Sequence, residues 1–336
     1  MNTHYVITNR EIVTNPKKKS KYMQVNEDEY IRIDGKELAR EDLRFGSYSF
    51  ANKKDKGTLT IFPEGDIETL DGNNIDSLPS YQLFDGVYNN MSSMEEGKGD
   101  TLVFIHGYNT DLEDALENVR VLHDLYVEND DSPINTIIIF TWSSKSNLLG
   151  YREDARDAKT SGFAFGRSIV KFISFLHYLK ESDKTFCNQN IHLLAHSHGN
   201  KVLEWTMLEL SDDVEYRLND LFANILLLAP DVDRDALDSP NPLYDLVDIS
   251  EKVHVFYHRR DTALVISENS KHPLNRLGRR GPKNELKWLK SDYKEYDVTR
   301  YKDDLGNIKQ KMFNHWYYYT SSKVINIIID IFKIRE

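Results

Sequence analysis

The sequence contains a single cysteine, Cys187, among 336 residues. An internal disulfide bond is therefore impossible, and so is a zinc site built on several thiolates. No run of 18 apolar residues occurs, which argues against an integral membrane segment. The most apolar stretch, 324–334, is interrupted by three polar residues and predicts a packed C-terminal helix. The N-terminus lacks the basic and apolar regions of a signal peptide, so we expect a cytoplasmic protein.

Basic residues are too few to balance the acidic ones. The 43 Lys and Arg residues face 54 Asp and Glu residues, which gives a formal net charge of −11. A general nucleic-acid binder needs a basic surface, so we expect no nucleic acid among the partners. The contents of 40% hydrophobic and 29% charged residues are ordinary for a globular protein with one large core. Nothing in the sequence indicates the oligomeric state.

The character of the chain changes near residue 100. Residues 1–98 are polar and rich in turns, with short strands expected at 5–8, 30–33 and 58–62. We therefore expect an N-terminal β-rich extension over 1–98 and a catalytic domain over 99–336. In the latter, apolar runs predict strands at 101–105, 134–141, 191–195, 222–229, 253–257 and 296–300.

Helical patterns separate these strands. One begins at a capping box formed by Thr110 and Glu113, and another spans 154–181, with Gly162 and Gly166 as points where it could break. A third spans 201–210. Nearly continuous apolar strands that alternate with helices favour an α/β fold, with a mostly parallel sheet covered on both faces. Ligands of such sheets bind at the carboxyl ends of the strands.

The strongest functional signal lies at 191–202. An apolar run is followed by His-Ser-His-Gly at 196–199 and then by a predicted helix. Strand, sharp turn and helix in this order are typical of a nucleophile elbow, which presents a serine hydroxyl to a cleft. Gly199 supplies one small residue of the G-x-S-x-G pattern, whereas Ala195 replaces the other glycine. Ser197 is therefore the candidate nucleophile.

Other strand ends carry the residues that such a serine needs. A histidine must take the hydroxyl proton, and a buried carboxylate must orient the histidine. The candidate acid is Asp261, with Asp231 and Asp233 as alternatives, and the candidate base is His315, with His272 as its main rival. The backbone N–H groups of Tyr108 and His198 are the expected oxyanion donors. Supporting residues at the same strand ends are His106, Gly107, Asn109, His196, Gly199, Asp231 and Asp233.

Two further clusters have less specific interpretations. Three histidines, His106, His196 and His198, do not have the spacing of a metal site, so we expect no metal. Arg276, Arg279 and Arg280 form the only basic cluster. It is either a solvated loop or a clamp for an anionic group of the substrate.

The motifs FIHGYNT at 104–110, AHS-x-GN at 195–200 and APD-x-D at 229–233 resemble a branch of the α/β-hydrolase superfamily first defined as a domain of unknown function. Tyr257-x-x-x-Asp261, the Arg276-Leu277-Gly278 segment and a late histidine, His315, also match. The resemblance covers roughly 100–320, with a weaker match at 7–10. His198 departs from it, because the branch usually carries methionine there.

This resemblance implies an esterase- or lipase-like serine hydrolase of α/β-hydrolase fold. Ser197 is then the nucleophile, Asp261 the acid and His315 the base, and no cofactor is needed. The expected substrate is a small-molecule or lipid ester. Two alternatives stay open: amide or peptide hydrolysis by the same residues, and a catalytically silent fold that serves as a binding module.

Overall fold

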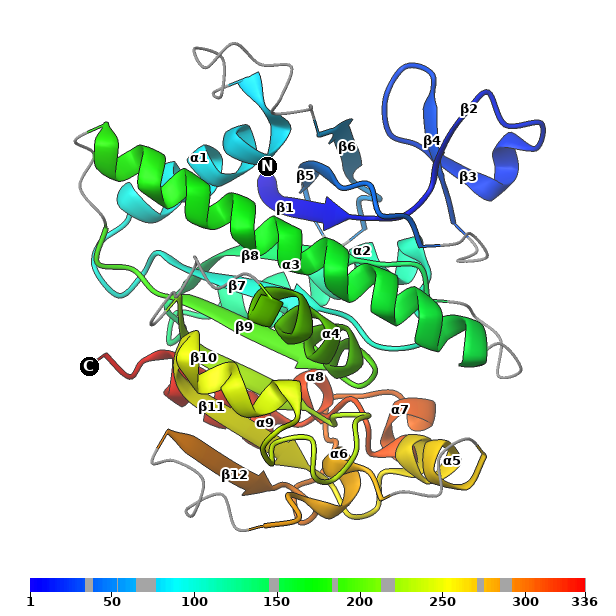
Figure 1. Ribbon diagram of the computed structural model, residues 1–336, viewed down its shortest axis with the longest axis vertical. Coiled ribbons are helices and arrows are strands. Elements are labelled where there is room, and N and C mark those ends of the chain that lie inside the picture. The colour runs from blue at the N-terminus through cyan, green and yellow to red at the C-terminus, as the bar shows by residue number, and fades with distance from the viewer. Residues whose placement is uncertain are drawn as a thin grey trace.

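The structure is a computed structural model that describes residues 1–33, 39–52, 54–64, 77–144, 151–182, 187–212, 221–270, 275–284 and 292–335. Its centre is a nine-stranded sheet with the strand order β12-β11-β10-β9-β7-β8-β1-β5-β6 (Figure 1). The strands from β12 to β1 run parallel, whereas β5 and β6 are antiparallel to their neighbours. The sheet comprises β1 (Asn2–Thr8), β5 (Arg44–Phe50), β6 (Thr58–Pro63), β7 (Asp100–Ile105), β8 (Ile134–Thr141), β9 (Ile191–His196), β10 (Phe222–Leu228), β11 (Ser250–Tyr257) and β12 (Tyr293–Asp297).

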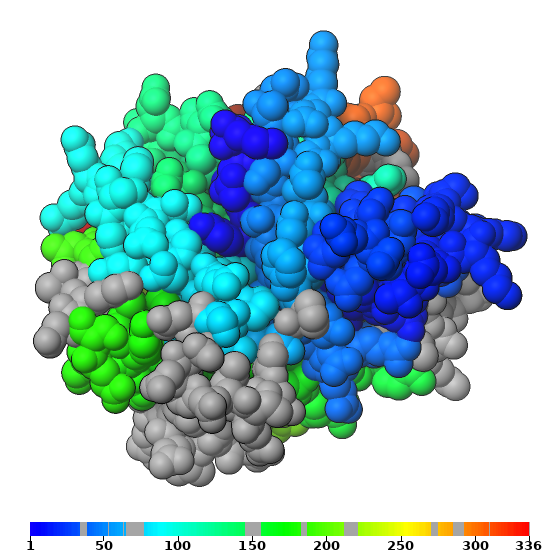
Figure 2. Space-filling model, turned by 90° about the horizontal axis from the view of Figure 1, so that it is seen from above, coloured from blue at the N-terminus to red at the C-terminus, as the bar shows by residue number. Residues whose placement is uncertain are grey.

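The N-terminal residues contribute to this sheet and also form a small one of their own. β1 pairs with β8 in parallel, and β5 and β6 extend the sheet beyond it. The second sheet is antiparallel and consists of β2 (Ile12–Thr14), β4 (Glu29–Arg32) and β3 (Tyr22–Gln24). Seen from above, these N-terminal strands and α1 form much of one face of the molecule (Figure 2). A mostly parallel sheet with helices and a β-rich N-terminal region confirms the predicted fold class.

Helices cover both faces of the central sheet. The helices of the described residues are α1 (Pro79–Ser92), α2 (Leu112–Leu122), α3 (Tyr151–Glu181), α4 (Gly199–Asp212), α5 (Thr262–Ser270), α6 (Leu277–Arg280), α7 (Ile308–Phe313), α8 (Tyr317–Thr320) and α9 (Ser322–Phe332). Shorter turns of helix lie at Lys19–Lys21, His123–Val127 and Pro242–Asp248. Among the described residues, no helix combines the length and apolarity that a membrane-spanning segment requires.

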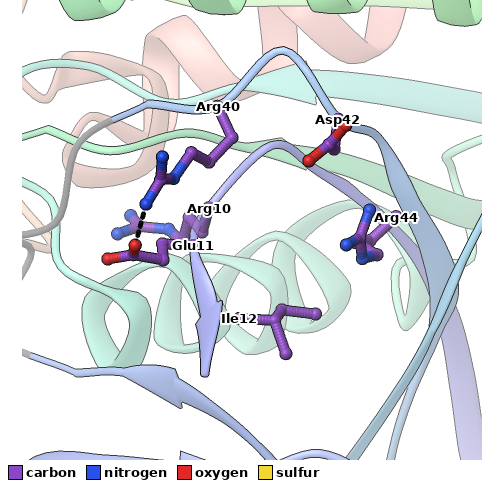
Figure 3. Close-up of a pocket in the computed structure, with 6 residues that line it drawn as sticks. All are labelled: Arg10, Glu11, Ile12, Arg40, Asp42 and Arg44. Carbon is purple, nitrogen blue, oxygen red and sulfur yellow. Dashed lines mark hydrogen bonds and ion pairs between the residues drawn. The ribbon is translucent and has the colours of Figure 1, made fainter. Parts of the chain in front are cut away.

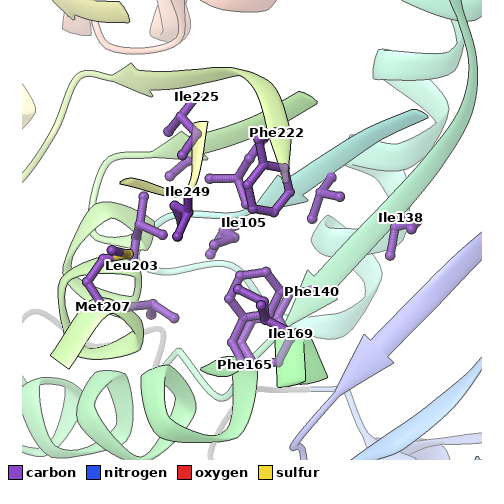
Figure 4. Packing of buried hydrophobic residues seen from close by; sticks show 14 of the residues in the cluster. Ile105, Ile138, Phe140, Phe165, Ile169, Leu203, Met207, Phe222, Ile225 and Ile249 are labelled. Carbon is purple, nitrogen blue, oxygen red and sulfur yellow. The ribbon is translucent and has the colours of Figure 1, made fainter. Parts of the chain in front are cut away.

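The core is divided into two layers by the sheet, because successive strand residues face opposite sides. In β7, Val103 and Ile105 pack with residues of α1, α3 and α4, whereas Leu102 and Phe104 pack with residues of α2 and α9. Figure 4 shows part of the first layer, where Phe140 of β8 lies beside Phe165 of α3. Each central strand is thus buried on both faces, which explains why it reads as a continuous apolar run.

Three details differ from the sequence-based expectation. The N-cap of α2 is Asp111, whose side chain accepts the Asp114 N–H at 2.9 Å, so Thr110 is not the cap. The last strand, β12, ends at Asp297 and thus begins and ends earlier than predicted. α3 is not broken at its glycines. A Cβ atom on Gly162 would lie 2.4 Å from the Cβ of Trp205, so glycine there allows α4 to pack closely on α3.

Candidate active site

Ser197 lies on a sharp turn between β9 and α4. Its φ of +53° is in the left-handed region, which non-glycine residues seldom adopt unless their surroundings hold them there. The Ser197 N–H donates to the Leu228 carbonyl at 2.9 Å. The buried Asn200 amide nitrogen donates to the carbonyls of Ala195 and Ser197 at 2.9 and 3.0 Å. These bonds fix a strained turn, as the predicted nucleophile elbow requires.

Two glycines allow neighbouring segments to approach this turn. A Cβ atom on Gly199 would lie 2.6 Å from the Ile105 carbonyl oxygen, and one on Gly107 would lie 2.8 Å from the Cβ of Ser197. Both distances are shorter than any ordinary contact, so only glycine fits without a shift. Ala195 is fully buried in β9 and its methyl group packs in the core. The missing first glycine of the pattern is thus accommodated.

Asp261 and His315, which are distant in sequence, meet beside this turn. Nδ1 of His315 lies 2.6 Å from Oδ2 of Asp261, while the other carboxylate oxygen accepts the Leu264 N–H at 2.9 Å. Asp261 is fully buried and His315 is 4% exposed. Burial raises the pKa of Asp261, and the neighbouring His315 opposes that rise. Because a carboxylate accepts this bond, the His315 proton resides on Nδ1 and Nε2 carries a free lone pair.

The segment that carries His315 is held by side chains from the strand ends. The hydroxyl of Tyr317 donates to the Phe256 carbonyl at 2.9 Å and accepts the Ala229 N–H at 2.7 Å. It thereby ties this segment to the ends of β10 and β11. Asn314, just before His315, has a left-handed φ of +50°, which ends α7 and redirects the chain toward the site.

His196 connects the elbow to His315. Its Nε2 donates to the His315 carbonyl at 3.1 Å, and the two imidazole centroids lie 4.7 Å apart. Burial lowers the pKa of His196 well below its ordinary value, so the ring is neutral. Among the described residues, the Ser197 hydroxyl makes no hydrogen bond to His315. Such bonds are often loose in a free enzyme and tighten when substrate binds.

His106 is fixed in one tautomer after β7. Its Nδ1 donates to the Gly107 carbonyl at 2.9 Å, and its Nε2 accepts the Trp142 N–H at 3.1 Å. Burial and the charge of Arg10 lower the pKa of His106 to about 3. This neutral ring stacks on Trp142 at 5.6 Å and braces the loop that leads to Tyr108.

The expected oxyanion donors lie on two adjacent segments. His198 directly follows Ser197, and its carbonyl accepts the Lys201 N–H at the start of α4. Tyr108 precedes Asn109, whose left-handed φ of +56° turns the loop. The rings of Tyr108 and His198 meet edge to face, with centroids 6.3 Å apart. The two residues are thus neighbours, as a shared oxyanion site requires.

The alternative acids have other partners. Asp231 contacts His198 Nδ1 at 3.2 Å and the Ser267 hydroxyl at 2.7 Å, and it also pairs with Arg276 at 3.3 Å. Asp233 accepts a hydrogen bond from Arg276 at 2.7 Å. Burial by itself would raise the pKa of Asp231, but its bond to His198 and the charge of Arg276 lower it below its ordinary value.

The arginine cluster predicted as an anion clamp faces carboxylates of the protein. Arg276 bridges the two aspartates described above, and Arg279 forms an ion pair with Glu268. Arg280 lies 3.8 Å from the same glutamate. These contacts tie α6 and the residue before it to α5 and to the loop after β10. A role of the cluster in substrate binding stays a prediction.

Within the described ranges, no group of three or more His, Cys, Asp or Glu side chains is arranged to hold a metal ion. His272 lies outside the described residues. Sequence reasoning gave no role to Asn200, Arg10 and Tyr317, which hold the elbow, the His106 loop and the His315 segment. The weak motif match at 7–10 was the only signal for Arg10.

A family model described as an alpha/beta hydrolase of unknown function (DUF900) matches residues 88–331. A search of curated proteins found no match. The matched segment begins within α1, ends within α9 and includes Ser197, Asp261 and His315. β1, β5 and β6 precede it. Because the match covers well over half of the sequence, the chain belongs to this family of α/β hydrolases.

Proposed function

We propose that the protein is a serine hydrolase that cleaves carboxylic esters through an acyl-enzyme on Ser197. The observation that carries this proposal is the buried Asp261–His315 pair, at 2.6 Å, beside a serine held at a φ of +53°. A serine hydroxyl is a poor nucleophile near neutral pH unless a base takes its proton. His315, with its proton on Nδ1, offers Nε2 for that purpose.

The proposed reaction has two halves. In the first, Ser197 Oγ attacks the ester carbonyl carbon while His315 Nε2 takes the hydroxyl proton. The oxyanion is stabilised by the N–H groups of Tyr108 and His198, and the tetrahedral intermediate expels the alcohol, which receives the proton from His315. In the second, His315 Nε2 takes a proton from water while the water oxygen attacks the acyl carbon. The second tetrahedral intermediate then breaks its bond to Ser197 Oγ, which receives the proton back from His315 as the carboxylic acid leaves. Asp261 stabilises the imidazolium in both halves.

The surroundings of His315 support an ester with an apolar part. Leu305, Ile308 and Met312 are 57%, 81% and 69% exposed, and all three lie on or just before α7, which leads directly to His315. Exposed apolar side chains that gather on one segment are suited to contact an apolar group, and we infer that these three do so. The substrate class we propose is therefore a small-molecule or lipid ester.

The deciding experiment is labelling with a fluorophosphonate, read by intact mass. We expect one adduct on the wild-type protein and none on Ser197→Ala. Ser168→Ala removes another buried serine, far along α3, and should be labelled like the wild type. Failure of a folded wild-type protein to react would overturn the proposal.

Matched ester and amide substrates would then separate esterase from amidase activity. We expect kcat/KM to be higher for the ester and to rise with acyl length, because apolar contact area increases. A preference for the amide, after correction for intrinsic reactivity, would replace the esterase proposal by amide hydrolysis with the same residues.

A further inference from the structure

A hollow lies away from the proposed catalytic residues. It has a volume of about 170 Å³ and is lined by Arg10, Glu11, Ile12, Arg40, Asp42 and Arg44 (Figure 3). Arg10 follows the carboxyl end of β1, and Arg44 begins β5 opposite Thr8. β8 separates β1 from β7, so the hollow shares the strand-end edge of the sheet with the catalytic residues but is distinct from them.

The lining is basic in a protein that is acidic as a whole. Three guanidinium groups face two carboxylates there, whereas the chain carries a net charge of −11. Glu11 is already paired with Arg40. In Figure 3, Arg10 and Arg40 lie on one side of the hollow and Arg44 lies on the other. Arginine stays charged at every physiological pH, so this local surplus of positive charge is permanent.

One donor in the lining lacks an acceptor. Nε of Arg44 is buried and has no hydrogen-bond partner among the described residues, while Nη1 of the same side chain donates to the Leu43 carbonyl at 3.0 Å. A buried N–H without a partner is costly, and the cost is larger on a charged group. An acceptor oxygen inside the hollow would remove that cost once the Arg44 side chain turned Nε toward it, because Nε is closed off from solvent in this structure. This observation points to a ligand that carries oxygen atoms.

The walls are fixed by hydrogen bonds. The side-chain amide of the buried Asn9 donates to the Arg40 carbonyl at 2.9 Å, and the backbone carbonyl of Asn9 accepts the Arg40 N–H at 3.0 Å. Arg10, 2% exposed, donates from Nε to the Thr141 hydroxyl at 2.9 Å and from Nη2 to the Thr110 carbonyl at 3.0 Å. The Arg40 backbone and the Arg10 side chain are therefore held in place before any ligand arrives, which lowers the entropy cost of binding.

We propose that this hollow binds a phosphate group, either free or as part of a phosphomonoester. A tetrahedral oxyanion presents acceptor oxygens to both sides at once, so it can meet Arg40 and Arg44 together, as planar guanidinium groups favour. Arg10 adds positive charge beneath. Asp42 is exposed to water, which screens its repulsion. The proposal does not depend on the esterase activity proposed above.

Isothermal titration calorimetry of the full chain tests this assignment. Inorganic phosphate and glycerol phosphate are titrated separately at constant ionic strength. We expect saturable binding at one site, and a loss of affinity of about tenfold or more in Arg44→Gln, which removes a charge-assisted hydrogen bond. Arg259→Gln is the matched control. It removes an exposed arginine paired with Asp297, far from the hollow, and should bind like the wild type.

Arg44→Lys guards against a folding defect, because it keeps the charge but lacks Nε. Its affinity should fall at least about threefold. Tighter binding of glycerol phosphate would identify an organic phosphate as the ligand, and equal binding would identify the phosphate group alone. Three results would each overturn the proposal: no saturable heat up to about 10 mM phosphate, wild-type affinity in Arg44→Gln, and displacement by equimolar chloride.

Discussion

A row of buried polar side chains crosses the sheet and makes the stability of the protein depend on pH. The Tyr296 hydroxyl lies 3.1 Å from His254 Nδ1, and His254 Nε2 lies 2.9 Å from the side-chain oxygen of Asn224. The Asn224 amide nitrogen lies 3.1 Å from His192 Nδ1, and His192 Nε2 lies 3.1 Å from Asp100. These contacts are all hydrogen bonds only when both histidines are neutral, with Nδ1 accepting and Nε2 donating in each ring. Each donor then points along the row in the direction of Asp100.

Protonation of His254 would break this pattern. Burial, followed by the charges of Lys294 and Lys252, lowers its pKa to about 3, from an ordinary value of 6.5. The pKa of His254 is lower in the folded than in the unfolded protein. The free energy of unfolding is therefore highest above pH 6.5 and decreases as the pH falls toward 3, because the unfolded state takes up the proton first. At pH 5 the unfolded state gains about 2 kcal/mol from protonating this one group.

Two other histidines add to the effect. Burial also lowers the pKa values of His4 and His106 to about 3. Together the three groups remove about 6 kcal/mol at pH 5, which is comparable to the whole unfolding free energy of many domains. The protein should therefore unfold in mild acid, well above the pH at which most carboxylates are protonated.

Urea denaturation, followed by far-UV circular dichroism between pH 7.5 and pH 5, measures this loss. His254→Gln replaces the ring by an amide that can donate to Asn224 and accept from Tyr296 but does not titrate. Its unfolding free energy should fall by about 2 kcal/mol less than that of the wild type over this range. Equal declines in the two proteins would refute the argument that His254 is held neutral by burial.

Three further predictions concern the proposed catalytic residues. Asp261→Asn should lower kcat for an ester about 10⁴-fold with little change in KM, because the amide cannot stabilise the imidazolium. Steady-state kinetics measures both constants, and a decrease in kcat of less than tenfold would exclude Asp261 as the acid. Gly107→Ala places a Cβ atom 2.8 Å from the Cβ of Ser197, so it should displace the loop that carries Tyr108. We expect kcat/KM to fall about a hundredfold. An unchanged kcat/KM would contradict the predicted crowding. His198→Met keeps the backbone N–H but removes the contact with Asp231. Urea denaturation should therefore give an unfolding free energy about 1–2 kcal/mol below that of the wild type, while kcat stays within about tenfold of it. A larger loss of kcat would assign the imidazole a direct role in catalysis.

The fold could be predicted where local sequence determines it, and only there. The central strands are buried on both faces, so each is a short apolar run that is recognisable from the local sequence. The place of β1 in the same sheet could not be found this way. It begins with polar residues and pairs across more than a hundred residues, Tyr5 with Ile138, and local patterns carry no information about such a partner. Arg10, which follows β1, was therefore not assigned to the His106 loop.

The same division applies to the site. The elbow is local, because strand, turn and helix are contiguous around Ser197. The partners of His315 come from elements far apart in the chain, and Tyr317 acts through its hydroxyl on two strand ends at once. The run of three tyrosines at 317–319 predicts an aromatic helix face. Its spacing does not indicate that the Tyr317 hydroxyl positions the segment that carries His315.

The three aspartates that sequence reasoning left as candidate acids now differ in their contacts. Asp233 faces Arg276, and Asp231 is shared among His198, Ser267 and Arg276, so both have their charge met by fixed partners. Asp261 has no basic group within ion-pair distance among the described residues except His315. A buried carboxylate whose only such partner is an imidazole gains most when that imidazole becomes charged, which is the step that general-base catalysis creates. This difference in environment supports Asp261 as the acid, because a carboxylate already neutralised by arginine would gain far less from the imidazolium.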